Sequence, residues 1–386
     1  MRTISHFIAR DTAPIVAAIL AFSSFTSCAI TAANGPTQGQ EVVFFPSIAS
    51  VSSDQKVLLT IQGRVFEPTE NSRGREALID VLAPLAGASR TDPLFRSRAS
   101  YFVSDSNRNV RVSVKVGDRV IVLPASNPAG YFIGDVTLTN DEIREGASGG
   151  VILFQSLPTA SNPQMFAGNA VLVPEEGVTV ITDMDDTIKV TDILDHQQKV
   201  ANTFVREFIE VPGMSALYRS WMQALGSRTH FHVVSAGPWQ FNEPLRRFTQ
   251  KAEFPVFTWD MRSVDIGDVS VLIKESFPDP EDVYEFKLQK IQAFMARFPK
   301  RHVVLVGDSG EKDPEVYAKV LSEFPNSVDA VFIRNVTRED QKDRRYQKLF
   351  PSGAAAAKLR VFLDPKELPP LIPPPIVQGA NPSWRN

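Results

Sequence analysis

Short continuous apolar runs alternate with amphipathic segments from residue 176 onward, and this pattern constrains the fold more than any other feature of the chain. The apolar runs are VTVI (178–181), HFHVV (230–234), HVVLV (302–306) and AVFI (330–333), and segments of helical periodicity separate them. Apolar strands divided by helices are typical of a parallel sheet that is covered on both faces. The sequence therefore predicts an α/β domain over 176–363 that contains a Rossmann-like parallel sheet.

Polar side chains follow three of these predicted strands. Asp183 ends the first strand, Ser235 the second and Asp308 a later one, and Asp185 and Asp186 come directly after Asp183. Ligands bind at the carboxyl ends of the strands in such sheets, so these side chains are expected to meet in space. Clustered carboxylates repel one another, and burial increases that cost. A divalent metal ion is the first candidate for the compensating positive charge.

The segment 41–175 has a different pattern. Five β-branched and aromatic runs with partial alternation are separated by turn residues: 41–49, 56–66, 111–123, 130–139 and 165–173. This density of short strands predicts an antiparallel β-sandwich-like domain. One amphipathic helix is expected within 76–85, where Leu78, Val81, Leu82 and Leu85 recur at helical spacing. Without paired carboxylates or a histidine cluster, the domain is interpreted as a binding or scaffolding module.

Composition narrows the classes of partner. The chain has 386 residues, 43% of them hydrophobic, a net charge of −3 and a pI near 6.0. It is therefore long enough for two domains, and no global field attracts it to nucleic acid. The most basic stretch, 334–348, has acidic residues between its cations and is interpreted as a solvated helix face. Contact of this stretch with anionic lipid headgroups is the alternative.

The first 33 residues resemble a bacterial export signal. Arg2 and Arg10 precede the apolar run PIVAAILAF, which is too short for a convincing membrane span, and small residues follow. Two alternatives stay open for the mature terminus: lipidation of Cys28, the single cysteine, or cleavage near Ala32 or Ala33. We therefore expect export from the cytoplasm, to the periplasm or a membrane-anchored state. Residues 34–40 are interpreted as a linker and 364–386 as a proline-rich tail.

Four motifs occur in the order that the haloacid dehalogenase superfamily uses. They are DxDxT at Asp183, Asp185 and Thr187, a serine after a strand at Ser235, a lysine near a helix start at Lys287, and GDxxxxD at 307–313. More narrowly, DMDDTIKVTDI, NTFVREFIEVPGM, FHVVSAGPWQF and VLVGDSGEKDPEVYA resemble the actin-patch phosphatidate phosphatase family. The resemblance covers roughly 177–335, and the β-rich segment is compatible with that family's upstream domain. Ala236 and Gly237 stand where the resemblance leads us to expect more polar residues before PWQ. This departure affects the expected substrate contacts and not the expected chemistry.

The resemblance implies a phosphatase that works through an aspartyl-phosphate. Asp183 is the implied nucleophile, and Asp185 the acid and base that exchanges a proton with the leaving alkoxide and then with water. The implied cofactor is Mg²⁺, held by Asp183, the backbone carbonyl of Asp185 and Asp308. Thr187, Ser235 and Lys287 are the implied ligands of the phosphoryl oxygens.

Several of these residues could have a structural role instead of a catalytic one. Lys287 is either a phosphate ligand or a surface lysine. Asp313, before Pro314, is a natural helix N-cap that also supports the metal ligands. Asp186 is assigned a structural role. His230 and His232, two apart on a strand, are interpreted as packed or hydrogen-bonded side chains rather than zinc ligands.

The implied substrate is phosphatidate, which would be converted to diacylglycerol and phosphate, and membrane-surface association would then be expected. A phosphatase of a soluble phosphomonoester and a non-catalytic exported binding protein remain alternatives. Receiver domains also combine aspartate, Ser/Thr and lysine on a parallel sheet. Their phospho-acceptor lies on a later strand than their acidic pair, whereas the acids of the first motif cluster here with Thr187.

Overall fold

The computed structural model describes residues 34–51, 56–68, 73–102, 104–143, 147–264 and 278–371. The predicted export signal with Cys28 and most of the proline-rich tail lie outside these residues. Within the described part, no helix combines the length and the apolar character needed to cross a bilayer. The predicted domain boundaries remain predictions, so the two regions are called here the N-terminal part and the C-terminal part.

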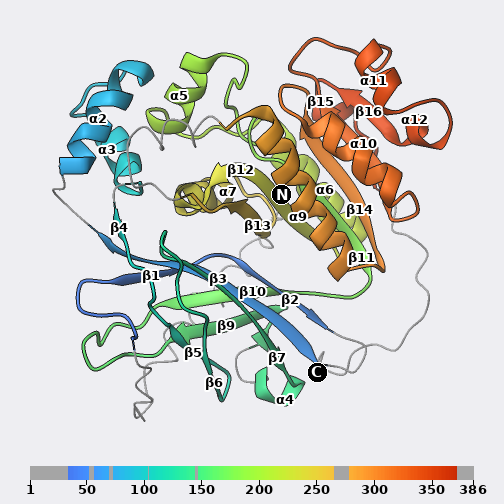
Figure 1. The fold of residues 1–386 in the computed structure, drawn as a ribbon. Helices are drawn as coiled ribbons and strands as arrows, with labels where there is room; N and C mark the ends of the chain where they lie inside the picture. Colours follow the sequence, from blue (N-terminus) through green and yellow to red (C-terminus); the bar gives the residue numbers. More distant parts are fainter. Residues whose placement is uncertain are drawn as a thin grey trace, which may run out of the picture.

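The N-terminal part is built around one sheet (Figure 1). Its strands run in the order β1–β3–β2–β10–β9–β5–β6, with β4 and β7 paired to β3, and β8 paired to β9. The strands are β1 Glu41–Phe44, β2 Ser47–Val51, β3 Val57–Pro68, β4 Ser104–Ser106, β5 Ser113–Val116, β6 Arg119–Val122, β7 Tyr131–Leu138, β8 Ala147–Ser148, β9 Val151–Ser156 and β10 Ala167–Val173.

This sheet confirms the predicted antiparallel β-rich region, and the sandwich-like packing of its strands remains a prediction. Hydrogen bonds join all ten described strands into one sheet, and side chains of β7, β5 and β9, which are not all neighbours in it, share one core. The twelve-residue β3 makes the continuity: it pairs with β1 and β2 and also with β7 and β4. The pairs are antiparallel except β2 with β10, which is parallel. Strand periodicity reports a half-buried surface and carries no information on which strand is the neighbour.

The helical interruption of the N-terminal part is longer than predicted. Helix α2 runs from Arg73 to Ala86, and a second helix, α3 Pro93–Ser100, follows it. Ile79 and Leu82 are buried, but Val81 is 37% exposed, so the expected apolar stripe was partly misplaced. Asp92 caps α3, because its carboxylate accepts the Phe95 N–H at 2.7 Å. A short helix, α4 Asn140–Ile143, lies farther along the chain.

The C-terminal part contains the predicted parallel sheet. Its strand order is β13–β12–β11–β14–β15–β16, and every neighbouring pair is parallel. The strands are β11 Gly177–Thr182, β12 His230–Pro238, β13 Phe257–Arg262, β14 Arg301–Asp308, β15 Val328–Arg334 and β16 Leu359–Phe362. The order reverses at β11, with β12 on one side and β14 on the other. Open α/β sheets bind ligands at such a reversal.

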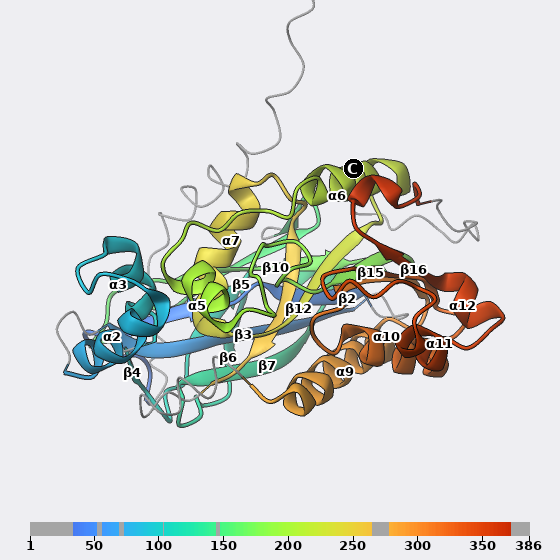
Figure 2. The same cartoon turned by 90° about the horizontal axis from the view of Figure 1, so that it is seen from above.

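Helices cover both faces of this sheet (Figures 1 and 2). Val180 and Ile181 are neighbours on β11 that are buried in different cores: Val180 packs with α6 and α7, and Ile181 with α9 and α10. Burial on both faces explains the unbroken apolar runs. The helices are α5 His196–Phe204, α6 Met214–Leu225, α7 Asn242–Lys251, α9 Pro280–Arg297, α10 Asp313–Glu323, α11 Arg344–Leu349 and α12 Ala354–Lys358, with 3₁₀ turns η1 Trp239–Phe241 and η2 Pro365–Glu367.

The two parts contact each other directly. The rings of Phe45 and Trp239 stack with centroids 4.2 Å apart. Arg297 of α9 reaches into the N-terminal sheet and donates hydrogen bonds to Thr60 Oγ1 at 2.7 Å and the Leu58 carbonyl at 2.8 Å. At the other end, α2 and α3 lie beside α5 in both views (Figures 1 and 2), and the rings of Phe102 and Phe204 are 5.8 Å apart.

Candidate active site

The structure brings the predicted site residues together at the carboxyl ends of β11, β12 and β14. Asp183 follows β11, Ser235 lies near the end of β12, and Asp308 ends β14. The backbone N–H of Asp183 donates to the Val306 carbonyl at 2.9 Å, which joins the first and fourth motifs at the point where the strand order reverses. All three side chains are buried, so water stabilises their charges little.

Asp183 lies at the centre of the cluster. Its Oδ1 is 2.9 Å from Lys287 Nζ, and its Oδ2 accepts a hydrogen bond of 3.4 Å from the Thr187 hydroxyl. Burial raises the pKa of Asp183 well above its ordinary value, Lys287 opposes that shift, and the carboxylates of Asp313 and Glu311 reinforce it. The negative charges around Asp183 therefore outnumber the one ammonium group of Lys287 that opposes them.

Lys287 is buried, which contradicts its interpretation as a surface lysine. Nζ lies 2.9 Å from Asp183, 2.6 Å from Asp313 and 3.2 Å from Glu311. Burial alone would lower the pKa of Lys287, but the carboxylates outweigh it and raise the pKa well above the ordinary value. The lysine is also not at a helix start: α9 begins at Pro280, seven residues earlier, because Asp279 and Pro280 supply a helix start that the sequence analysis overlooked.

Asp313 does not cap its helix, which corrects the predicted N-cap role. Lys312 is the N-cap, and Asp313 is the first residue of α10. Its Oδ2 accepts the Asp308 N–H at 3.1 Å and its Oδ1 accepts from Lys287. Gly307 permits this approach, since a Cβ there would overlap the Asp313 carboxyl group. Asp313 thus holds the backbone of Asp308 and the ammonium group of Lys287.

Asp308 has one carboxylate oxygen that is buried and lacks a hydrogen-bond donor among the described residues. Its Oδ1 accepts the Gly310 N–H at 2.6 Å, whereas its buried Oδ2 has no hydrogen-bond partner among the described residues. Burial and the charges of Asp313 and Asp183 raise the pKa of Asp308 well above its ordinary value. A buried carboxylate oxygen without a donor is costly unless a cation or proton satisfies it.

This arrangement fits a divalent cation. Asp183, Asp308 and Asp313 each offer an oxygen, and these oxygens lie within 4.8 Å of one another. Among the described residues, Lys287 is the single ammonium group that contacts this cluster of four carboxylates, which includes Glu311. Hard carboxylate oxygens are the ligands that Mg²⁺ and Ca²⁺ accept. The unpaired Asp308 oxygen and the excess negative charge are the features that a cation would relieve.

Asp185 has a different environment from the other acids. Its Oδ1 accepts a hydrogen bond from the Thr191 hydroxyl at 2.6 Å and lies 2.8 Å from Lys189 Nζ. Burial raises the pKa of Asp185, but the charge and hydrogen bond of Lys189 and the hydrogen bond of Thr191 outweigh it, and the pKa is lowered. Two carboxylates two residues apart therefore have pKa values that move in opposite directions.

Asp186 forms a loop scaffold, in keeping with its assigned structural role. Its backbone has φ of 51°, and its carboxylate accepts the N–H groups of Thr191, Asp192 and Ile193 at 2.6–2.9 Å. Arg334 donates to its carbonyl at 2.6 Å. The loop that follows the first motif is thus closed by one side chain.

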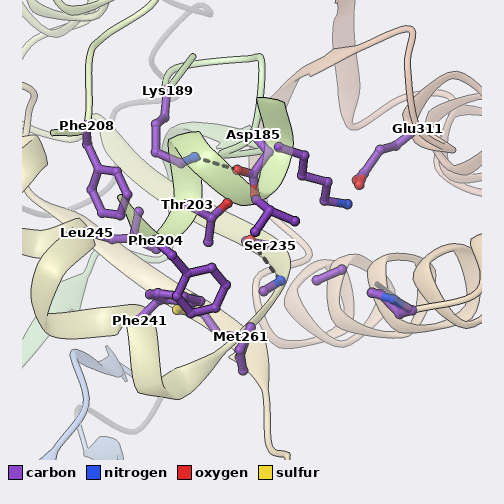
Figure 3. Close-up of a pocket in the computed structure, with 16 residues that line it drawn as sticks. Asp185, Lys189, Thr203, Phe204, Phe208, Ser235, Phe241, Leu245, Met261 and Glu311 are labelled. Carbon is purple, nitrogen blue, oxygen red and sulfur yellow. Dashed lines mark hydrogen bonds and ion pairs between the residues drawn. The ribbon is translucent and has the colours of Figure 1, made fainter. Parts of the chain in front are cut away.

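Ser235 is buried beside the acidic cluster. Its Oγ accepts the Gly237 N–H at 3.1 Å, as Figure 3 shows. Asp185, Ser235 and Glu311 line one pocket. The small residues Ala236 and Gly237 line the same pocket, so the departure from the expected polar pattern leaves space rather than additional hydrogen-bonding groups.

Several residues of this site were not predicted from the sequence. Lys189 and Thr191 hold Asp185, and Glu311 contacts Lys287. Arg345 donates to the carbonyls of Ser309 at 2.7 Å and Glu311 at 3.0 Å. Lys189 stands four residues after Asp185, which is a signal that could have been used. Arg345, from a distant segment, gave no such signal.

The basic stretch 334–348 is not a continuous solvated helix. Its one helix is α11, six residues long. Arg334 and Arg345 point instead toward the backbone of the loops that carry the site. The solvated-face interpretation was therefore wrong for these two arginines.

The two histidines are packed and hydrogen-bonded, as interpreted from the sequence. His230 Nε2 and His232 Nδ1 lie 2.8 Å and 2.7 Å from the Thr258 hydroxyl, and His232 Nε2 lies 3.2 Å from Asp260 Oδ2. Both rings stack on Phe294. They belong to the core between β12 and α9.

Beyond Asp185 and Ser235 the pocket becomes apolar. Figure 3 shows the polar groups of Asp185, Lys189 and Glu311 on one side and a group of apolar side chains on the other. The apolar side is formed by Phe204, Phe241, Leu245 and Met261, and Phe208 lies beside Lys189, whose Nζ is 5.1 Å from the ring centroid. The site thus joins a charged end to an apolar wall.

Known proteins are similar to the part of the chain that carries this site. Residues 178–335 match the family model described as "Phosphatidate phosphatase APP1, catalytic domain". An uncharacterized protein of Schizosaccharomyces pombe is 26% identical over 220 residues, which are 55% of this chain and 34% of that protein. Phosphatidate phosphatase APP1 of Saccharomyces cerevisiae is 29% identical over 161 residues, which are 41% of this chain and 26% of that protein. The chain spans about a quarter to a third of the length of these relatives.

Proposed function

We propose that this chain, whose residues 178–335 belong to the phosphatidate phosphatase APP1 catalytic-domain family, is a metal-dependent phosphatase that hydrolyses phosphatidate to diacylglycerol and phosphate. One observation carries the proposal. The ends of β11 and β14 bring Asp183 and Asp308 together, α9 places Lys287 beside Asp183, and one buried oxygen of Asp308 has no donor among the described residues. A scaffold or binding module has no need for such an uncompensated cluster. The haloacid dehalogenase-type fold of the C-terminal part belongs to the same proposal.

Asp183 is the nucleophile in this proposal. One carboxylate oxygen attacks phosphorus, the bond from phosphorus to the ester oxygen breaks, and an aspartyl-phosphate forms. Lys287, 2.9 Å from Asp183, holds the nucleophile and meets the charge that spreads over the phosphoryl oxygens in the transition state. Thr187 and Ser235 supply hydroxyl groups at the same place. Water then attacks the aspartyl-phosphate, which releases phosphate and restores Asp183.

Asp185 exchanges protons in both steps. It gives a proton to the leaving alkoxide and later takes one from the attacking water. Its contacts with Lys189 and Thr191 both use Oδ1, which leaves Oδ2 for that exchange. Burial raises the pKa of Asp185, and Lys189 and Thr191 lower it, so these two residues influence how readily Asp185 gives and takes the proton.

Mg²⁺ is the proposed cofactor, held by Asp183, Asp308 and the carbonyl of Asp185. When bound it would neutralise the phosphate and the carboxylates that otherwise repel it. Asp313 binds Lys287 and the Asp308 backbone with its two oxygens, so it supports these ligands from behind.

The test is phosphate release by the purified chain, with phosphatidate in mixed micelles and glycerol 3-phosphate as substrates, in Mg²⁺ and in excess EDTA. We expect Mg²⁺-dependent hydrolysis with phosphatidate preferred. Full activity in EDTA would overturn the metal assignment, and a tenfold preference for glycerol 3-phosphate would favour the soluble phosphomonoester. No hydrolysis of either ester, with metal present, would favour the non-catalytic binding protein.

Export and membrane-surface association complete the proposal. They rest on the sequence of residues 1–33 alone, which lie outside the described structure. Mass spectrometry of the protein from its native host should show that the first 27 to 33 residues are removed. An intact Met1 would exclude both the lipidated and the cleaved form.

A further inference from the structure

We infer that the apolar wall of the pocket beside Asp185 and Ser235 binds the acyl-bearing alcohol of the ester, and that this wall determines the preference for lipid over small polar phosphate esters. The inference rests on the proposed function and adds to it the place where the substrate is selected. It concerns only residues that the structure describes.

The pocket has two chemically different sides. Asp185 and Ser235 lie at the end where phosphate would be bound, and Phe204, Phe241, Leu245 and Met261 form the other side (Figure 3). These four apolar side chains are buried. Since the ester oxygen bonds phosphorus to the alcohol, a phosphoryl group beside Asp185 directs its alcohol into this pocket.

The wall selects by its inability to form hydrogen bonds. The polar side chains of the pocket are Asp185, Lys189, Lys199, Thr203, Ser235 and Glu311. Against the four apolar side chains, a glycerol with free hydroxyl groups would lose water without gaining partners, which costs free energy for each unpaired group. An acylated glycerol instead removes apolar surface from water against phenylalanine, leucine and methionine side chains. The same wall therefore favours one class of alcohol and penalises the other.

The N-terminal part holds this wall in place. Phe102, just after α3, packs edge-on against Phe241 with centroids 4.7 Å apart, and Phe95 packs against Phe204 at 6.5 Å. Arg98 of α3 donates to the carbonyls of Thr203 at 2.9 Å and Arg206 at 2.6 Å, at the end of α5. A wall that is formed before the substrate arrives loses little entropy on binding.

Thr203 offers a way to fill the pocket without changing the catalytic groups. It is half-buried, lies on α5 and lines the pocket between Lys189 and Phe204 (Figure 3). Thr203→Phe places a ring where the acyl chain would lie. Gln197→Phe is the matched control, because Gln197 is an exposed residue of the same helix that does not line the pocket.

The experiment compares kcat/KM for dihexanoyl phosphatidate, kept below its micellar concentration, with kcat/KM for glycerol 3-phosphate. The unaltered chain should prefer the lipid at least tenfold, which corresponds to about 1.4 kcal/mol. Thr203→Phe should reduce that ratio about tenfold or more, and Gln197→Phe should keep it. An equal loss on both substrates, or an unchanged ratio in Thr203→Phe, would overturn the inference.

A second measurement needs no variant. With n-alkyl phosphates of increasing length, kcat/KM should rise with chain length until the pocket is filled. A flat series with clear hydrolysis would refute the pocket inference and leave the phosphatase standing. Absence of hydrolysis for every ester would refute the proposed function itself.

Discussion

The two sheets of this molecule use polar residues in opposite ways. In the parallel sheet, Asp183, Ser235 and Asp308 converge at one edge and are buried there together. In the ten-stranded sheet, polar side chains form separate local pairs, as when the Thr60 hydroxyl donates to Asp135 at 2.5 Å and Arg64 donates to Ser106 at 3.0 Å. Among the described residues, a potential metal cluster occurs only in the parallel sheet.

Strand direction explains the difference. Parallel strands place all their carboxyl ends at one edge, so polar residues that follow different strands meet. Antiparallel strands alternate, and equivalent residues are divided between two edges. The N-terminal sheet thus supplies support: it contacts the C-terminal part through Phe45 and through Arg297 of α9, and the helices that connect β3 to β4 pack against the pocket wall.

The largest expected effect is on the nucleophile of the parallel sheet. Asp183→Asn keeps the shape of the side chain but removes its charge, so turnover of phosphatidate should fall by about 10³-fold or more. The acid-labile phosphoenzyme should vanish as well. Rapid quench with ³²P-labelled substrate measures both, and wild-type rates in the variant would assign the nucleophile elsewhere.

The next effect concerns proton transfer. Asp185→Asn should lower kcat by about 10²–10⁴-fold, the usual size of an acid–base contribution. A phosphoenzyme should still form with p-nitrophenyl phosphate, because that leaving group needs little protonation. If phosphoenzyme formation were slowed equally with p-nitrophenyl phosphate and with phosphatidate, Asp185 would not be the acid that protonates the leaving group.

Arg98 and Arg297 each donate hydrogen bonds between the N-terminal and C-terminal parts. Variants of the two can distinguish contacts that support the site from contacts that support only the fold. Arg98→Met leaves the carbonyls of Thr203 and Arg206 without their donor, and Arg297→Met does the same to Ile48 and Leu58. Each change should lower the free energy of unfolding by about 1–3 kcal/mol, as measured by urea denaturation.

The two arginine variants should differ in activity. Arg98 orders the end of α5, so Arg98→Met should also raise KM for dihexanoyl phosphatidate, whereas Arg297→Met should leave kcat/KM unchanged. The opposite result would mean that the N-terminal part supports the site through α9 rather than through α3.

The smallest expected effect is a pH dependence within the parallel sheet. Burial, together with the charges of Arg301 and His232, lowers the pKa of His230 well below 6.5. The unfolded chain therefore takes up a proton below pH 6.5 that the folded chain does not, and stability falls as the pH decreases, by at most about 1.4 kcal/mol per pH unit.

His230→Gln removes the imidazole that takes up a proton in the unfolded chain, and it keeps a polar group near Thr258. The free energy of unfolding of the variant, minus that of the unaltered protein, should increase when the pH is lowered from 6.5 to 5. Taking the difference cancels the contribution of the buried carboxylates, whose raised pKa values act with the opposite sign. A difference that is constant with pH would show that folding does not change the pKa of His230.

The sequence by itself predicted the parallel sheet and the acids at its edge. Strands that are buried on both faces must be apolar without interruption, so the polar residues that end them stand out and converge at one edge of the sheet. The sequence also located Asp183, Asp185, Ser235, Lys287, Asp308 and Asp313, which the structure brings to that edge, although the true start of α9 and the orientation of Asp313 were not foreseen.

Only the tertiary structure decided how these groups are charged and which residues support them. The pairing of Asp185 with Lys189, the unpaired oxygen of Asp308 and the contact of Arg345 with the loop at Ser309 depend on side-chain directions, which periodicity does not contain. The joining of ten strands into one sheet and the packing of α3 against α5 depend on contacts between residues far apart in the chain. Local patterns report which surface of a segment is buried, whereas its partner is chosen by the packing of the whole molecule.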